Sequence, residues 1–163
     1  MKKKLIVLLQ QQISLLRQLI KLQSMRTLTQ VILSKIGTDA SPHDLAPDEL
    51  GCAETVTTVK REHDGITPVM IGTWSLYVYM EHPANGWERI EEPEEECIVI
   101  SPTGLGKKGT NGHVGFVIRL NGELVIVSND SRTGKFLQNF SINRWLSYFG
   151  ALGYPTFYYR KKK

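Results

Sequence analysis

Two apolar runs rich in β-branched residues, at positions 114–118 and 124–127, flank the dipeptide Asn121-Gly122. An Asn-Gly pair between two such runs is typical of a two-residue type I′ turn, because both turn residues must take positive φ. The pattern therefore predicts a β-hairpin with its turn at residues 121 and 122.

Counting back from this turn gives the register of the hairpin, since side chains alternate between the two faces of a strand. The predicted pairs are Leu120 with Glu123, Val117 with Ile126, Gly115 with Ser128, and His113 with Asp130. His113 would then lie beside a carboxylate, an arrangement that orients an imidazole for proton transfer. A nucleophile elsewhere in the chain would complete a catalytic site.

Apolar positions 52, 56 and 59 fall on one helical face after the turn-prone residues 46–51, which predicts a helix from Cys52 to about residues 62–65. Shorter patterns predict a helix at 74–80, strands at 87–90 and 97–101, a glycine-rich loop at 102–112, a turn at 131–134, a helix at 142–149 and a strand at 157–159. Only the segment 74–80 is ambiguous, because its aromatic residues also allow a strand. The chain is expected to be an α+β protein with helices packed on an antiparallel sheet.

The N-terminus starts like a secretory signal, but its apolar run, Leu5–Leu9, stops after five residues and is too short for one. Ile13, Leu16 and Leu19 then recur at roughly helical spacing, so we predict an amphipathic helix over residues 3–24. Its apolar stripe fits three roles: packing on the domain, pairing with a second copy, or lying on a membrane surface. The pattern does not choose among them.

Residues 25–37 are weakly periodic and end at Gly37, a natural C-cap, and residues 38–42 have the composition of a linker. We therefore assign residues 1–38 to an N-terminal helical segment with its linker and residues 39–163 to one globular domain. The length of 163 residues and the hydrophobic content of 41% are sufficient for such a core.

Charge is distributed unevenly along the chain. Residues 1–38 contain seven basic residues and no acid, and the last four residues are all basic, so the part between them is about seven units negative. A bacterial wall, an anionic membrane or nucleic acid would attract such basic ends. We nevertheless expect no nucleic-acid partner.

Cys52 is the better nucleophile of the two cysteines. A thiol in the first turn of a helix meets free amides and the positive end of the macrodipole, which favour the thiolate, and the same amides can hold an oxyanion. Gly51 would leave room for a substrate, and Glu54 would complement the macrodipole. Cys97, in a buried strand, is expected to behave as a small hydrophobe. No disulfide framework and no metal-ligand spacing is present in the sequence.

The order cysteine, histidine, polar third residue is that of papain-like cysteine hydrolases. Four motifs together resemble the CHAP and NlpC-type peptidoglycan amidase and peptidase superfamily, in particular its small phage-type members: Gly51–Glu54 opening a helix, the strand within Pro93–Ile100, Gly112–Val117, and Ser128–Asp130. The resemblance covers about residues 40 to 160. Cys97 stands where the superfamily usually has an aspartate.

The resemblance implies a papain-like fold and an enzyme that needs no metal or organic cofactor. It would hydrolyse an amide bond in the stem peptide or cross-bridge of peptidoglycan, as an N-acetylmuramoyl-L-alanine amidase or an endopeptidase. Cys52 would be the nucleophile and His113 the base. The third residue is Asp130 by the parity of the hairpin, or Asn129 if a bulge shifts the register by one.

Peptidoglycan is thus the expected partner. We expect a protein made in the cytoplasm without a clear cleavable signal and acting at the bacterial cell wall, as a phage lysin or a wall-remodelling enzyme. The alternative is a non-enzymatic phage-assembly or membrane-surface protein, in which the papain-like domain binds and residues 3–24 form a homo-oligomer.

Overall fold

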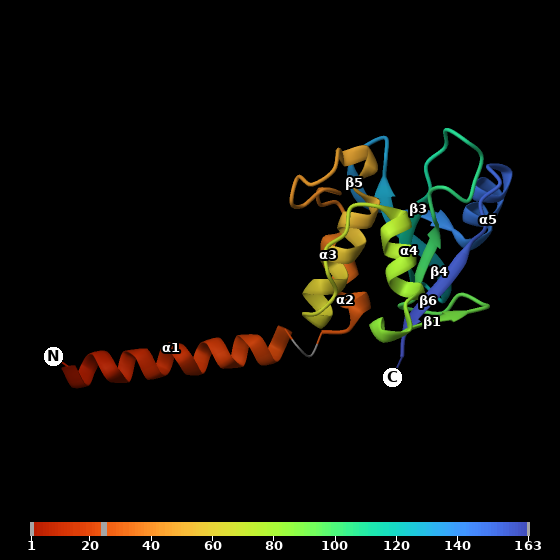
Figure 1. Ribbon diagram of the computed structural model, residues 1–163. Coiled ribbons are helices and arrows are strands. Elements are labelled where there is room, and N and C mark those ends of the chain that lie inside the picture. Colours follow the sequence, from red (N-terminus) through yellow and green to blue (C-terminus); the bar gives the residue numbers. More distant parts are fainter. Residues whose placement is uncertain (1, 24–25, 163) are drawn as a thin grey trace.

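The computed structural model describes residues 2–23 and 26–162, and Figure 1 shows how their helices and strands are arranged. The strands are β1 (Trp87–Ile90), β2 (Ile98–Ser101), β3 (His113–Leu120), β4 (Glu123–Asp130), β5 (Lys135–Ser141) and β6 (Phe157–Lys161). The helices are α1 (Lys2–Gln23), α2 (Leu28–Lys35), α3 (Cys52–Asp64), α4 (Thr73–Glu81) and α5 (Ile142–Ala151), with single 3₁₀ turns at Asp48–Leu50 and Pro83–Asn85. The strands form one antiparallel sheet in the order β1-β6-β2-β3-β4-β5, which confirms the expected α+β class.

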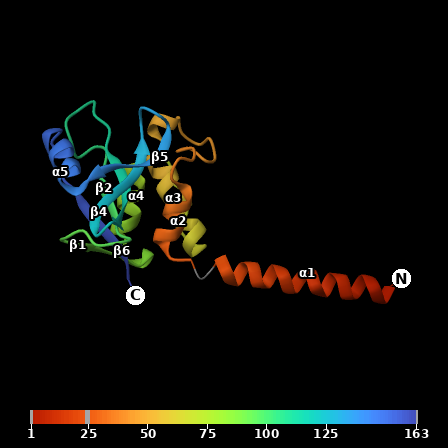
Figure 2. The ribbon, with the colours of Figure 1, turned by 180° about the vertical axis from the view of Figure 1, so that it is seen from behind.

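Alternating side chains of the sheet enter two separate cores. On one side, called the α3 face, residues such as Ile100, Val114 and Phe116 pack against helices α2, α3 and α4. On the other side, called the α5 face, Val99 and Val117 pack against α5. The sheet is therefore the middle layer of three, as the views from opposite sides in Figures 1 and 2 show.

The predicted hairpin is present. Asn121 and Gly122 have φ angles of 50° and 86°, and the observed pairing includes Leu120 with Glu123 and Gly115 with Ser128. The pairing of β3 with β4 ends there, two residues short of the predicted contact between His113 and Asp130. On the other edge of β3, His113 pairs with Ser101 of β2.

Strand β5 was not predicted from the sequence. It pairs with β4 along its whole length, but Ile126 lies opposite Phe140 while Val127 lies opposite Gln138. Asn139 is therefore the extra residue of a β-bulge, a feature that redirects side chains and is frequent beside functional sites.

Helix α2 belongs to the core of the domain. A capping box between Thr27 and Gln30 starts the helix, and Val31 and Ile32 are buried against α3. The folded core therefore includes residues before 39, the predicted start of the globular domain, because the apolar residues of α2 pack against α3.

Helix α1 extends away from the domain in both ribbon views. It begins one residue before the predicted helix, and the predicted end at residue 24 lies outside the described residues. None of the helices among residues 2–23 and 26–162 is long and apolar enough to cross a bilayer.

Candidate active site

The loop before α3 fixes the position of Cys52. The Glu54 carboxylate is fully buried and accepts hydrogen bonds from the Ser41 hydroxyl and from the amides of His43 and Ala46 (2.6, 2.7 and 3.2 Å). Glu54 thus does more than complement the helix dipole, because it holds the loop that leads to Cys52. The side chain of His43 is exposed and takes no part in this network.

Gly51 is needed for a reason that differs from the predicted one. A Cβ at this position would lie 2.2 Å from the carbonyl oxygen of Ala40, so the space is occupied by the protein's own backbone and does not admit a substrate. The hydroxyl of Thr55 donates to the same carbonyl and ties the loop to the first turn of α3.

His113 is the first residue of β3 and its ring lies on the α5 face. The ring stacks against Trp145 and Phe149, with centroid distances of 5.5 and 5.9 Å and interplanar angles of 28° and 17°. The Trp145 indole N–H donates to the hydroxyl of Ser101, which fixes this wall of the site (3.2 Å). The imidazole is therefore held by packing as well as by hydrogen bonds.

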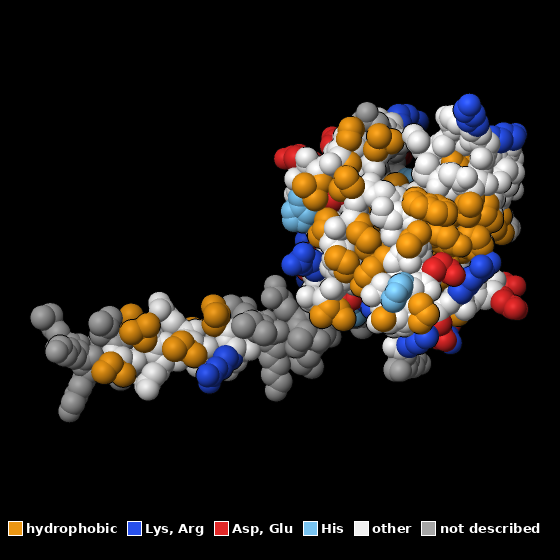
Figure 3. Space-filling view, in the orientation of Figure 1, with side chains coloured by type: hydrophobic (Ala, Val, Ile, Leu, Met, Phe, Trp, Pro, Cys, Tyr) orange, Lys and Arg blue, Asp and Glu red, His pale blue; other side chains and the backbone are white. Residues whose placement is uncertain are grey.

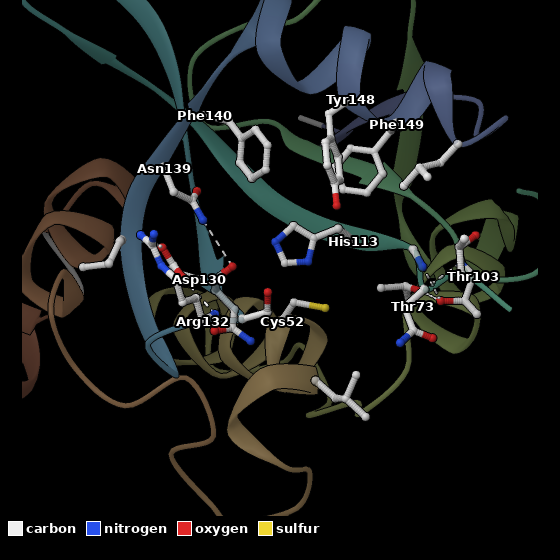
Figure 4. Close-up of a pocket in the computed structure, with 18 of the residues that line it drawn as sticks. Cys52, Thr73, Thr103, His113, Asp130, Arg132, Asn139, Phe140, Tyr148 and Phe149 are labelled. Atoms are coloured by element: carbon white, nitrogen blue, oxygen red, sulfur yellow. Dashed lines mark hydrogen bonds and ion pairs between the residues drawn. The ribbon is translucent and has the colours of Figure 1, made fainter. Parts of the chain in front are cut away.

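Cys52 and His113 line the same cavity, which has a volume of about 1040 Å³. Burial raises the pKa of the Cys52 thiol, and the backbone amide of Val114, the neighbour of His113, offsets part of this rise. Figure 4 shows the Cys52 side chain beneath the imidazole. The two residues that the sequence predicted as nucleophile and base are therefore brought together from α3 and β3.

A chain of hydrogen bonds determines which nitrogen of His113 carries the proton. The Asn139 amide donates from Nδ2 to the carbonyl of Asn129 (3.2 Å), so its Oδ1 accepts the hydroxyl proton of Ser128 (2.7 Å). The Ser128 oxygen can then only accept from Nε2 of His113 (3.1 Å). In the neutral ring Nδ1 keeps its lone pair, and it is free to act as a base.

Neither predicted third residue hydrogen-bonds to the imidazole through its side chain. Asp130 lines the cavity, but its carboxylate accepts from the amides of Arg132 and Thr133 in its own turn (2.9 and 3.2 Å). The side chain of Asn129 donates to the carbonyl of Asp48 (2.7 Å), on the side of β4 away from Ser128.

Ser128 and Asn139 were not among the predicted site residues, and only Ser128 could have been found from the sequence. Ser128 follows from the correct register, because it lies on the same face of the hairpin as His113. Asn139 could not be found in this way, since its direction depends on a bulge in a strand that was not predicted.

Burial has the largest effect on the pKa values of Cys52 and His113. It raises the pKa of Cys52 to about 11, although the amides of Val114, Ala53 and Cys52 lower it. It lowers the pKa of His113 to about 4, although the Asn129 carbonyl and the Asp130 carboxylate raise it. Near neutral pH the pair is therefore a thiol and a neutral imidazole, and the predicted preference for thiolate is outweighed by desolvation.

A second hydrogen-bonded cluster fixes the loop that leads into β3. The hydroxyl groups of Thr73 and Thr103 are 2.8 Å apart, and the Gly112 amide donates to Thr103 (2.9 Å). A Cβ on Gly112 would lie 2.1 Å from the Ser101 carbonyl, so this close passage requires glycine. The start of β3, and with it His113, is thus joined to the first turn of α4.

No family model matches this chain, and no curated protein is significantly similar to it in sequence. Among residues 2–23 and 26–162, no group of three or more His, Cys, Asp and Glu side chains could hold a metal ion.

Proposed function

We propose that the cavity is the active site of a cysteine amidase or peptidase of papain-like type. The observation that carries the proposal is that Cys52 and His113, from two distant elements, line one cavity while Ser128 holds the ring tautomer that leaves Nδ1 free. A buried inert thiol would need neither a neighbouring oriented base nor a cavity.

The residues supply the steps of acyl transfer. Nδ1 of His113 takes the proton of Cys52 as the sulfur attacks an amide carbonyl, and the first amides of α3 stabilise the oxyanion by about 3 kcal/mol per donor. His113 then gives this proton to the nitrogen of the leaving amine as the C–N bond breaks. Water finally hydrolyses the thioester, with His113 again acting as the base.

The substrate class rests on the sequence resemblance alone. The motifs around Cys52, His113 and Ser128–Asp130 favour peptidoglycan, with cleavage in the stem peptide or cross-bridge, by a phage lysin or a wall-remodelling enzyme. The cavity adds a compatible shape, because one side is aromatic (Phe140, Tyr148).

Zymography on purified cell walls tests the proposal. The wild type should clear the walls, and Cys52→Ala should lose clearing by about 10⁴-fold or more, because no other nucleophile replaces the thiol. Cys97→Ala is the matched control, since it removes the other thiol without touching the cavity. Equal clearing by the wild type and Cys52→Ala would contradict the enzymatic proposal. Wall binding without clearing would favour the non-enzymatic alternative.

Mass spectrometry of the released muropeptides would then identify the bond. New amino groups on L-alanine would indicate an amidase, and new termini within the peptides would indicate an endopeptidase.

A further inference from the structure

Helix α1 carries large apolar side chains that the domain leaves uncovered. Six of them have exposed fractions between 49 and 62%: Ile6, Leu8, Leu9, Ile13, Leu15 and Leu16. The helix extends away from the domain, and Figure 3 shows apolar side chains along it. Such a surface on a folded chain marks an interaction site.

These six residues share one side of the helix. At 100° per residue they spread over an arc of roughly 180°, which is interrupted by Gln12, while Gln10, Gln11, Ser14, Arg17 and Gln18 occupy the rest of the circumference. Ile6, Leu9, Ile13 and Leu16 alone have the spacing of the a and d positions of a two-stranded coiled coil, but Leu8 and Leu15 widen the apolar arc beyond that narrow seam. A half-apolar circumference fits a helix that lies in an interface with its apolar side down.

Charge separates the possible occupants of this surface. Residues 2–23 contain four lysines and one arginine and no acidic residue. Two copies of α1 side by side would therefore repel each other and could form no interhelical ion pairs, whereas anionic lipid headgroups would attract each basic residue.

We propose that α1 is an interfacial membrane helix that binds the surface of bilayers containing anionic lipids. The apolar side enters the boundary between headgroups and acyl chains, and the basic residues remain among the headgroups. The helix lies on the bilayer and does not cross it, in agreement with its short apolar length. This proposal is independent of the chemistry at Cys52.

Flotation of the full chain with lipid vesicles tests the proposal. The probes are vesicles of phosphatidylcholine alone and of phosphatidylcholine mixed with phosphatidylglycerol. We expect the chain to float with the anionic vesicles about tenfold more strongly than with the neutral ones, and raised salt should weaken this binding.

Matched substitutions identify the side of the helix that binds. The double variant Leu9→Gln, Leu16→Gln should bind anionic vesicles about tenfold or more weakly, because it removes two apolar side chains from the middle of the arc. The control Gln11→Ser, Gln18→Ser changes two residues of the polar side and should bind like the wild type. All variants should keep the thermal unfolding transition of the domain, since none of these residues belongs to its two cores.

Two results would overturn the proposal. One is equal binding of the anionic vesicles by the wild type and the Leu9, Leu16 variant. The other is absence of flotation together with a dimer that the same substitutions dissociate in sedimentation equilibrium, which would assign the apolar side to a second copy. Flotation by Cys52→Ala should equal that of the wild type whether or not the protein is a hydrolase.

Discussion

The two faces of the sheet are both buried, yet they consist of different side chains and have different roles. The α3 face is mainly aliphatic and holds the helix that carries Cys52. The α5 face contains Trp145, Phe149 and the imidazole of His113, whose polar atoms continue into Ser128. One face thus positions Cys52 by packing, and the other holds a titratable ring and determines its tautomer.

The two faces meet at the start of β3, which explains why the site is there. Side chains alternate along a strand, so His113 lies on the α5 face and Val114 on the α3 face. Burial raises the pKa of Cys52, and the amide between these two residues is among the groups that lower it. The start of β3 is therefore the place where the imidazole on one face and the thiol beside the other line the same cavity.

Removing a large ring from either core should have the largest effect on stability. Phe116 and Trp145 are both fully buried, and each substitution by alanine should lower the free energy of unfolding by about 3–5 kcal/mol. Urea denaturation would measure this loss. Only Trp145→Ala should also reduce wall hydrolysis in the protein that remains folded, because Trp145 stacks on His113. An activity loss as large in Phe116→Ala would contradict this division between the faces.

Removing one buried hydroxyl from each face should separate function from stability. Ser128→Ala breaks the link between His113 and Asn139, so hydrolysis should fall about tenfold to hundredfold as the ring loses its fixed tautomer. Thr57→Val removes a hydroxyl that bonds within α3 and to the Met70 amide, at a similar stability cost of about 1–3 kcal/mol. Steady-state kinetics should show a loss only in the Ser128 variant. Unchanged turnover in Ser128→Ala would remove Ser128 from the mechanism.

Sequence patterns predicted the parts of this site that local rules determine. The Asn121-Gly122 turn fixes the hairpin because few other residues tolerate its φ angles, and the helix start at Cys52 follows from local periodicity. The register was correct as far as Ser128 and failed only in its extension to Asp130.

The parts that were missed depend on contacts between distant segments. Asn139 reaches Ser128 because of a bulge in β5. The polar and apolar residues of β5 do not alternate regularly across that bulge, so no strand pattern is visible in the sequence. Glu54 is buried because the loop 41–46 folds over it, which no pattern near Glu54 indicates. The pKa values of Cys52 and His113 likewise depend on burial, which only the assembled fold determines.

The α5 face should make stability sensitive to acid through His113. Its pKa is lowered from 6.5 to about 4, so between these values the unfolded chain binds a proton that the folded chain does not. The contribution of His113 to the free energy of unfolding is therefore complete above pH 6.5 and is lost as the pH falls toward 4. We expect a loss of about 1–3 kcal/mol, a reduced value because part of the ring faces the cavity.

Urea unfolding from pH 7 to pH 4 would measure this loss. The variant His113→Gln should lose less stability over the same range, because it lacks the imidazole. The carboxylates and the other histidines contribute to both proteins and therefore cancel in the comparison. Parallel curves for the two proteins would show that the ring is not held neutral.

The smallest expected difference separates the two cysteines. Burial raises the pKa of Cys52 to about 11 and that of Cys97 to about 12, so both thiols should react slowly with iodoacetamide near neutral pH. Access should decide between them, because Cys52 opens on the cavity while Cys97 is fully buried in the α5 face. We expect Cys52 to be labelled about tenfold faster, as followed by mass spectrometry of tryptic peptides.

Faster labelling of Cys97 would contradict the inference that the cavity gives reagents access to the Cys52 thiol. The control is labelling in concentrated urea, where both thiols should react at similar rates. Unfolding removes the burial that raises both pKa values, and it also removes the cavity that gives the reagent access to only one sulfur.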